Sequence, residues 1–160
     1  MAMHEPQLLA YLSGEVHSDW RAEIEHCTRA HSLPVDFAAP VTEHSASDEC
    51  GVATLGPESQ RFWYDHKGAK LNAVRSRVLM ARADVVVVRF GEEYKQWNAA
   101  FDAGWAVANE IPLITMHPES LDHALKEVDA AALVVARTAQ QVADALRYVV
   151  SGRLPSPKGT

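Results

Sequence analysis

The 160-residue chain has little of what marks secreted, membrane or zinc-binding proteins. Its two cysteines, Cys27 and Cys50, form no CxxC pair, so we expect free thiols rather than a disulfide framework. No apolar run approaches the roughly 18 residues of a membrane span. The N-terminus also lacks the charged-then-apolar layout of a signal peptide. These absences predict a cytoplasmic protein without a membrane partner.

Positive charge is also scarce, with 15 Lys and Arg against 21 Asp and Glu and a net charge of −6. This balance argues against nucleic acid as a partner. The phosphate-binding motifs GxGxxG and GxxxxGK[ST] are absent, which disfavours the usual form of dinucleotide binding. The eight histidines include no HxH or HExxH motif. We therefore expect no metal and no cofactor.

What the chain does contain is a regular alternation of strands and helices. The segment DVVVVRFG (84–91) has four consecutive valines, which indicates a central parallel strand buried on both faces. Similar apolar runs predict the other strands at 7–14, 35–41, 111–118 and 131–137. Helical patterns lie between and after these runs, at 18–33, 61–82, 99–109, 119–130 and 138–152. Ser18, Asn98 and Thr138 are the predicted N-caps of three of these helices.

Two segments between strands 2 and 3 have special features. Residues 42–60 are rich in turn formers and show no clear period, which predicts a lid or binding loop. The helix 61–82 contains Gly68, where a break into two pieces is expected. Its second piece has an apolar line that we expect to face the core, formed by Leu71, Val74, Val78 and Ala81.

The alternation predicts an α/β fold with a doubly wound, five-stranded parallel sheet and helices on both faces. The simplest strand order is 2-1-3-4-5. A single domain is expected over 1–152, followed by a mobile tail at 153–160. In such sheets the ligand lies outside the carboxyl ends of the strands, at the switch point between strands 1 and 3. The loops after strands 1, 3 and 4 are expected to form one crevice there.

Asp102 is the main catalytic candidate, because it is the one acidic residue in the small, apolar run NAAFDAGWAVA. Near the start of a helix, the dipole and nearby amides should lower the pKa of its carboxyl group. An ionised carboxylate held in a crevice can act as a nucleophile or stabilise a cationic transition state. The alternative is that Asp102 belongs to the solvated side of its helix, together with Asn98 and Asn109.

The segment YLSGEVHSDWR supplies the opposite wall of the predicted crevice. Tyr11 lies near the end of the strand, and Gly14 allows a ligand to approach the backbone closely. Glu15 and His17 follow in the loop, either as site residues or as an exposed pair. The helix start after Ser18 is a possible anion site.

The loop after strand 3 provides the remaining substrate-binding candidates. Arg89 interrupts an apolar run beside the crevice, and arginine suits the recognition of phosphate or carboxylate. Gly91, Gln96 and Asn98 follow it in the same loop.

Several of these segments resemble a known superfamily. AYLSG, ARADVVVVRF and NAAFDAGWAVANEIPLI are similar to motifs of the nucleoside 2-deoxyribosyltransferases. YLSGEVHSDWR and ADVVVVRFGEEYKQWNAAFDAGWA resemble more closely the YtoQ family, which belongs near that superfamily. The resemblance implies that Asp102 takes the place of the nucleophilic glutamate in the superfamily's E-x-G-[YF]-A helix. It also implies that Tyr11 orients this nucleophile, and that the protein forms a homodimer or a larger homo-oligomer.

The sequence departs from the superfamily at several positions. Aspartate is one methylene shorter than glutamate, and Ser76 and Arg77 lie where an acidic residue contacts the base. Gln96, Trp97 and Asn98 replace an acidic residue and glycines. The leading hypothesis is an N-glycoside hydrolase or glycosyltransferase that acts on a nucleoside, nucleotide or related ribosylated small molecule. In it, Asp102 attacks, Tyr11 and Asn98 orient it, and Glu15 or His17 supplies the proton. The alternative is a non-catalytic small-molecule or nucleotide binder that uses the same crevice.

Overall fold

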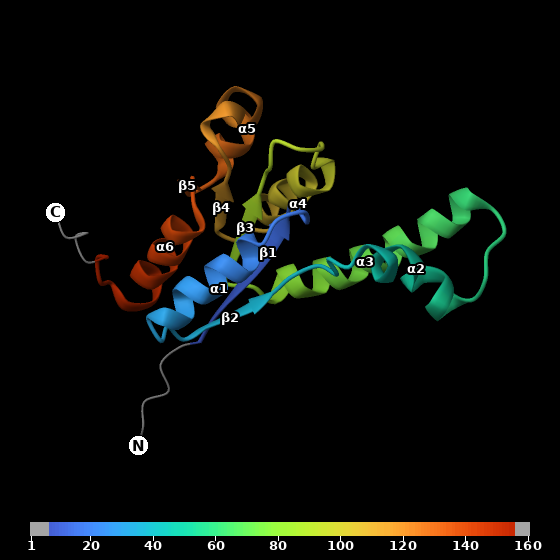
Figure 1. Cartoon of the computed structure of the whole chain (residues 1–160), viewed down its shortest axis with the longest axis horizontal. Coiled ribbons are helices and arrows are strands. Elements are labelled where there is room, and N and C mark those ends of the chain that lie inside the picture. Colours follow the sequence, from blue (N-terminus) through green and yellow to red (C-terminus); the bar gives the residue numbers. More distant parts are fainter. Residues whose placement is uncertain (1–6, 156–160) are drawn as a thin grey trace, which may run out of the picture.

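A computed structural model of the chain describes residues 7–155, which include a five-stranded parallel sheet (Figure 1). Its strand order is β2-β1-β3-β4-β5, and every neighbouring pair is parallel. This arrangement confirms the predicted fold class and strand order. The strands are β1 (Leu8–Gly14), β2 (Val35–Ala38), β3 (Val85–Arg89), β4 (Leu113–Met116) and β5 (Val134–Ala136).

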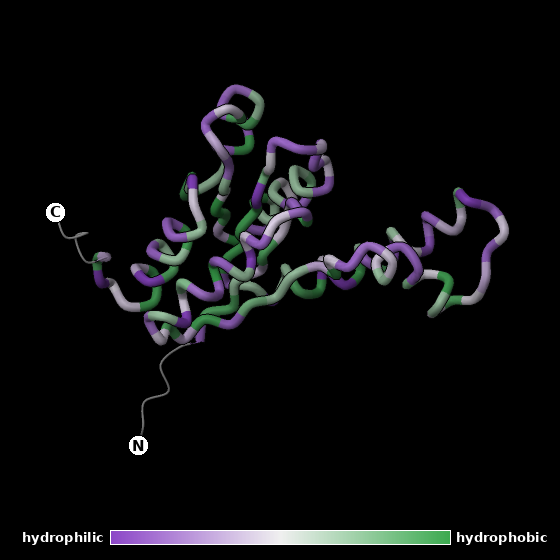
Figure 2. Tube along the Cα trace, in the orientation of Figure 1, coloured by the Kyte–Doolittle hydropathy of each residue, from purple (hydrophilic) through white to green (hydrophobic). Residues whose placement is uncertain are grey.

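Helices pack on both faces of the sheet because alternate residues of the strands point to opposite sides. Val85 and Val87 face a core formed with α1 (Trp20–Ala30) and α6 (Ala139–Ser151). Val86 and Val88 face a second core, which receives side chains of α3 (Arg61–Arg82), α4 (Trp97–Ala108) and α5 (Asp122–Ala131). The four valines are therefore buried on both faces, as the sequence predicts. Figure 2 shows hydrophobic residues along these central strands.

The segment between β2 and β3 differs from the prediction. Residues 44–55 form a helix, α2 (His44–Leu55), so the expectation of an irregular loop over 42–60 is wrong. Helix α3 runs without interruption through Gly68, so the expected break is also wrong. We call α2 and residues 61–72 of α3 the arm, because they project beyond the end of the sheet (Figure 1). The arm is held together mainly by contacts between its own two helices.

A glycine pair explains why these two helices approach so closely. Gly51 on α2 and Gly68 on α3 are both buried, and a Cβ atom added to Gly51 would lie 2.3 Å from the backbone nitrogen of Gly68. Any side chain at position 51 would push the helices apart. A Cβ atom on Gly68 would lie 3.0 Å from the carbonyl oxygen of Asp48, so this glycine serves helix packing and does not mark a break in the helix.

The predicted core-facing line of α3 is not buried in the described residues. Val74 and Val78 are 60% and 43% exposed, and Ala81 is also exposed. The face that packs on the sheet instead carries Met80. These residues do recur at helical spacing, but the face of α3 that they form points away from the core.

Two of the three predicted helix caps differ in the structure. Helix α1 begins at Trp20 after Asp19, so Ser18 is not its N-cap. Helix α4 begins at Trp97, which places Asn98 inside the helix rather than at its cap. Thr138 caps α6 as predicted, because its hydroxyl accepts a hydrogen bond from the Gln141 amide.

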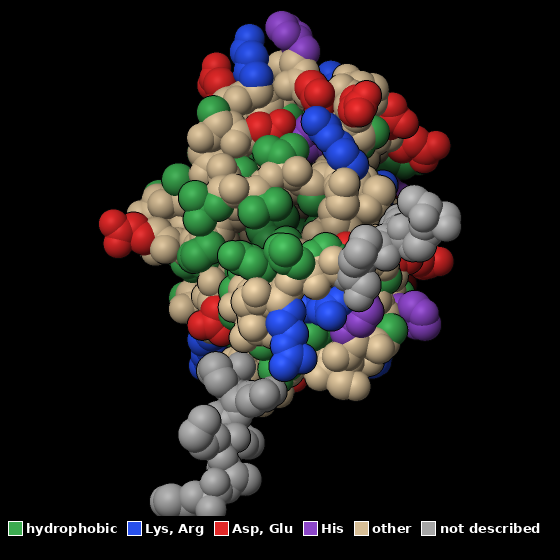
Figure 3. Space-filling view, turned by 90° about the vertical axis from the view of Figure 1, so that its left-hand side faces the viewer, with side chains coloured by type: hydrophobic (Ala, Val, Ile, Leu, Met, Phe, Trp, Pro, Cys, Tyr) green, Lys and Arg blue, Asp and Glu red, His purple; other side chains and the backbone are tan. Residues whose placement is uncertain are grey.

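The remaining segments complete the description of the chain. A short 3-10 helix, η1 (Glu119–Leu121), leads into α5. The predicted tail is described as far as Pro155 and has no regular structure from Gly152 to that point; residues 156–160 lie outside the described residues. Figure 3 views the side of the molecule on the left of Figure 1 and shows hydrophobic side chains gathered on it. Within 7–155, no helix is both long and apolar enough to cross a membrane.

Candidate active site

A cavity of about 780 Å³ lies at the carboxyl end of β1, beside the start of α4. Its wall on the body of the molecule comes from the end of β1, the loop after β3 and the first turns of α4. The arm and the rest of α3 form the opposite wall. Six of the predicted site residues line the cavity, namely Gly14, Glu15, His17, Gln96, Asn98 and Asp102. Tyr11, Arg89 and Gly91 are not among its lining residues.

Asp102 lies in the second turn of α4, and its half-buried carboxylate opens onto the cavity. The Ser13 hydroxyl donates a hydrogen bond to Asp102 Oδ2 over 2.6 Å. Burial raises the pKa of the Asp102 carboxyl, while the Ser13 hydrogen bond and the charge of Arg77 act against this shift. The expected lowering of the pKa is therefore wrong in direction, because burial outweighs the effects that stabilise the charge.

Tyr11 lies close to Asp102 but does not contact the cavity. Its side chain is fully buried, and its hydroxyl has no hydrogen-bond partner among the described residues. Burial raises the pKa of this phenol, and the negative charge of Asp102 adds to the shift. The nearby Ser76 hydroxyl acts in the opposite direction without reaching hydrogen-bonding geometry. The group that holds Asp102 here is thus Ser13, not Tyr11.

Glu15 stabilises the loop between β1 and α1. Its carboxylate accepts hydrogen bonds from the His17 amide and from the Ser18 hydroxyl. Arg89 Nη1 lies 3.5 Å from Glu15 Oε2 and donates to Ser18 Oγ over 3.0 Å. Burial acts to raise the pKa of Glu15, but these hydrogen bonds and the Arg89 charge bring it below its ordinary value. The Glu15 carboxylate is therefore occupied within the loop that leads into α1.

Arg21 provides a second support for the same loop. Its guanidinium donates hydrogen bonds to three backbone carbonyls, those of Leu12, Gly14 and Glu15. Burial lowers the pKa of Arg21 to about 10. The carboxyl end of β1 is consequently fixed by the Arg21 guanidinium, and the loop that follows it by the Glu15 carboxylate.

Two glycines allow this loop to approach the loop after β3. Gly14 has a φ of +113°, and a Cβ atom there would lie 2.1 Å from the carbonyl oxygen of Arg89. A Cβ atom on Gly91 would lie 2.9 Å from Cγ of Glu15. Gln96 holds the loop, because its side chain accepts from the Gly91 amide and donates to the Glu93 carbonyl. Gly91 is thus a packing residue, whereas Gln96 also lines the cavity.

The arm places several polar residues opposite Asp102. His44 and Asp48 of α2 line the cavity, as does His17 on the body wall. His44 Nε2 lies 3.8 Å from a carboxylate oxygen of Asp48. On the body wall, the His17 ring lies against Tyr94, with 4.6 Å between the ring centroids.

Ser13 is the main site residue that the sequence reasoning missed. A signal was present, because Ser13 follows Tyr11 by two residues and so points to the same face of β1. A polar side chain at the carboxyl end of an otherwise buried strand indicates a site. The expected contribution of the loop after β4 is wrong, since none of its residues lines the cavity.

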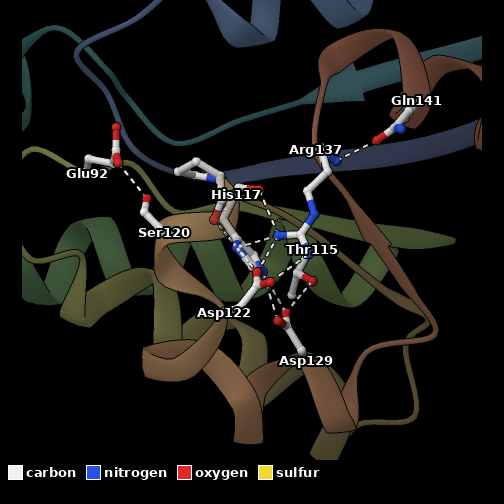
Figure 4. A network of polar contacts seen from close by, with 9 residues as sticks. Glu92, Thr115, His117, Ser120, Asp122, Asp129, Arg137 and Gln141 are labelled. Carbon is white, nitrogen blue, oxygen red and sulfur yellow. Dashed lines mark hydrogen bonds and ion pairs between the residues drawn. The ribbon is translucent and has the colours of Figure 1, made fainter.

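That loop instead belongs to a separate polar network at the ends of β4 and β5 (Figure 4). The buried His117 lies with its Nε2 atom 2.8 Å from an Asp129 oxygen. Arg137 donates to Asp122 over 2.5 Å and lies 3.3 Å from His117 Nδ1. His117, Asp122 and Asp129 are close enough to bind a metal ion, but the Arg137 guanidinium already supplies the positive charge there. The network attaches α5 to the sheet.

The chain also matches a known family at the level of sequence. The model of the family described as nucleoside 2-deoxyribosyltransferase YtoQ matches residues 11–150. The chain belongs to this family. A relative from Bacillus subtilis (strain 168), an uncharacterized protein YtoQ, is 42% identical over 143 residues, which cover 89% of this chain and 97% of the relative.

Solved structures support the fold of the family at low sequence identity. A conserved protein from Enterococcus faecalis V583 has a TM-score of 0.62 and 13% identity, and the match covers 90% of this chain and 99% of that one. The 2-deoxyribosyltransferase from Bacillus psychrosaccharolyticus has a TM-score of 0.52 and 13% identity, with coverages of 85% and 90%. The matched family region includes Ser13, Glu15 and Asp102.

Proposed function

We propose that the protein cleaves the N-glycosidic bond of a nucleoside or a related ribosylated small molecule, with Asp102 as the attacking carboxylate. The supporting observation is the position of Asp102, which opens onto the cavity beside the end of β1 while one of its oxygens is held by Ser13. The family description, a nucleoside 2-deoxyribosyltransferase, agrees with this reaction class.

In the proposed first step, an Asp102 oxygen forms a bond to the anomeric carbon as the bond from this carbon to the base nitrogen breaks. The base leaves with the electron pair of that bond and takes up a proton. His17 is the better placed donor, because it lines the cavity and the Glu15 oxygens already accept hydrogen bonds. A water molecule or a second base then attacks the same carbon and releases the Asp102 carboxylate. Water gives hydrolysis, and a second base gives transfer.

The charges around the cavity favour a substrate without a phosphate group. Arg89, the predicted phosphate ligand, is paired with Glu15 and does not line the cavity. The carboxylates of Glu15, Asp48, Asp65 and Asp102 do line it, against two cationic side chains, Arg77 and Lys95. The excess of carboxylates over cationic side chains in this lining disfavours the binding of a phosphate. Nucleosides are therefore the first compounds to test.

The decisive experiment compares Asp102→Asn with the unmodified protein on pooled nucleosides, with chromatography to detect released base. The substitution should lower turnover by at least about a thousandfold, because an amide cannot form the glycosyl ester. The melting temperature should not fall, since burial already acts against the charged form of Asp102. Asp65→Asn, on the arm wall of the same cavity, serves as the matched control and should retain most of kcat.

Two results would count against this assignment. Full activity in Asp102→Asn would exclude a carboxylate nucleophile at this position. Stabilisation of the unmodified protein by nucleosides without any released base or exchanged base would instead favour the non-catalytic binder.

We propose that the protein forms a homodimer through an exposed apolar face of α3 and α4. Trp63, Val74 and Val78 lie on one side of α3, and Phe101 of α4 lies next to Arg77 of α3. All four apolar side chains are at least 43% exposed. A second copy covers this face in the proposed assembly, which also stabilises the arm. Val74→Asp should shift the mass in sedimentation velocity from dimer to monomer; a monomeric unmodified protein would contradict the proposal.

A further inference from the structure

Ser13 and Asp102 form a pair that brings together two distant parts of the chain. Ser13 is the sixth residue of β1 and pairs with Val88 in the sheet, whereas Asp102 lies on α4. The distance of 2.6 Å between Ser13 Oγ and Asp102 Oδ2 is typical of a strong hydrogen bond from a hydroxyl to a carboxylate. Ser13 is 1% exposed, so water does not compete freely for its hydroxyl.

The neighbouring residues make Ser13 the donor available to this carboxylate. Tyr11 points to the same face of β1 but lies two residues, or roughly 6.6 Å, further from the carboxyl end of the strand. Its hydroxyl has no partner in the described part of the chain. Ser76 and Arg77 also line the cavity, but neither donates a hydrogen bond to Asp102 among the described contacts. Because the aspartate side chain is short, only a donor near the carboxyl end of β1 reaches it, and Ser13 is that donor.

We infer that Ser13 is the positioning residue of this site, holding one oxygen of Asp102 so that the other is free to attack the substrate. A carboxylate that is held through one oxygen loses rotational freedom, and its second oxygen becomes the nucleophilic atom. The backbone around Ser13 is itself fixed by Arg21 and by the close contact of Gly14 with Arg89. The inference rests on the proposed function only for its effect on turnover, because the contact itself can be measured without a substrate.

The first measurement is a carbon-13 NMR titration of the Asp102 carboxyl group in the unmodified protein and in Ser13→Ala. The hydrogen bond from Ser13 favours the ionised form, so its loss should raise the pKa of Asp102. Ser13→Thr retains a hydroxyl, so the midpoint of the Asp102 titration should be the same in this variant as in the unmodified protein. Ser13→Cys, a weaker donor of similar size, should give a smaller rise. Ser76→Ala removes another hydroxyl of the same cavity and should leave the midpoint unchanged.

The second measurement is the pH profile of turnover for the same variants. Ser13→Ala should lower kcat by about ten- to a hundredfold, the range expected for one hydrogen bond to a charged group, and should change KM much less. The acidic limb of the profile should move to higher pH by the same amount as the NMR midpoint. Ser13→Thr should restore both values.

The outcomes separate this inference from the proposed function. An unchanged Asp102 midpoint in both Ser13→Ala and Ser13→Cys would overturn the positioning role, even if both variants were active. A raised midpoint that Ser13→Thr reverses supports the role, even if no nucleoside is cleaved by any form of the protein. In that case the proposed reaction fails, but the assignment of Ser13 stands. Circular dichroism of each variant checks that the fold is retained.

Discussion

The two walls of the cavity are built in different ways. On the body wall, Ser13, Glu15 and Gln96 come from segments next to the central strands, and the side chain of each is held by a hydrogen bond: Ser13 to Asp102, and Glu15 and Gln96 to backbone amides of their own loops. On the arm wall, His44, Asp48 and Asp65 are all exposed. Within the arm, α2 packs on α3 through the close contact of Gly51 with Gly68 and through hydrogen bonds such as that from Asn72 to Ser47.

This difference suggests a division of roles between the walls. Groups that take part in bond cleavage have to be held within a fraction of an ångström, and the body wall meets this requirement. Groups that select a substrate can lie on an element that moves or that a second copy orders. Changes in the arm should therefore alter substrate binding, whereas changes in the body wall should alter the reaction step and the stability of the fold.

The largest expected effect, and the strongest test of these separate roles, comes from breaking the contact between the two helices of the arm. Gly51→Val places a branched side chain where even one Cβ atom would lie 2.3 Å from the Gly68 nitrogen. We expect a loss of about 3 kcal/mol in the free energy of unfolding, at the upper end for overpacked sites. KM should rise strongly while kcat changes little. Urea unfolding and steady-state kinetics measure these effects.

The matched control for this change is Gly104→Ala in α4. No atom lies within 4 Å of the position that its Cβ would take. The control should stabilise the protein by about 0.5–1 kcal/mol, because alanine favours a helix over glycine. If Gly51→Val were as stable as the control, the close packing of α2 on α3 would not exist in solution.

The sequence predicted the sheet better than the arm, and the physical reason is the kind of burial involved. The run of valines in β3 has one explanation, burial on both faces, and the structure confirms it. The apolar spacing of Val74 and Val78 has two explanations, since such a stripe can face the core or another molecule. The sequence pattern shows that a face is apolar but not what covers it.

The site shows a similar limit. The sequence predicts that Asp102 and the end of β1 share one crevice, and the cavity is lined by both. The role of Ser13 depends on a contact between residues 89 positions apart, which a periodic pattern cannot reveal. The helix α2 was missed because its sequence, HSASDECGVATL, is rich in small and polar residues and has almost no apolar face. Its place in the fold comes from the glycine contact with α3.

A smaller effect is expected on the body wall from Glu15→Gln. The glutamine keeps the shape of the side chain but leaves Arg89 without its carboxylate partner. At neutral pH the unfolding free energy should fall by about 2 kcal/mol, as for the loss of hydrogen bonds to a charged group. Glu127→Gln, at an exposed position of α5, is the control and should have almost no effect.

The pH dependence of this effect has a definite sign. The pKa of Glu15 in the folded protein lies below its ordinary value of 4.5, so its contribution to stability is fully present above that value. The contribution is lost as the pH falls through the lowered pKa of the folded state. The difference between Glu15→Gln and the unmodified protein should therefore shrink on acidification. A difference that stays constant from neutral pH to pH values well below 4.5 would show that Glu15 acts through its shape and not its charge.

The smallest effect tests a polar contact within the arm. Asn72 of α3 donates hydrogen bonds to the carbonyl and the hydroxyl of Ser47 on α2, and both residues line the cavity. Asn72→Ala should cost about 1 kcal/mol of unfolding free energy, because the two neutral hydrogen bonds that it removes share one nitrogen and are only partly buried. If the arm governs substrate binding, KM should rise severalfold while kcat and the acidic limb of the pH profile stay unchanged. Asn72→Asp, which keeps the size but loses the donor, should behave in the same way. A change in kcat instead would place the arm in the reaction step and remove the distinction between the two walls.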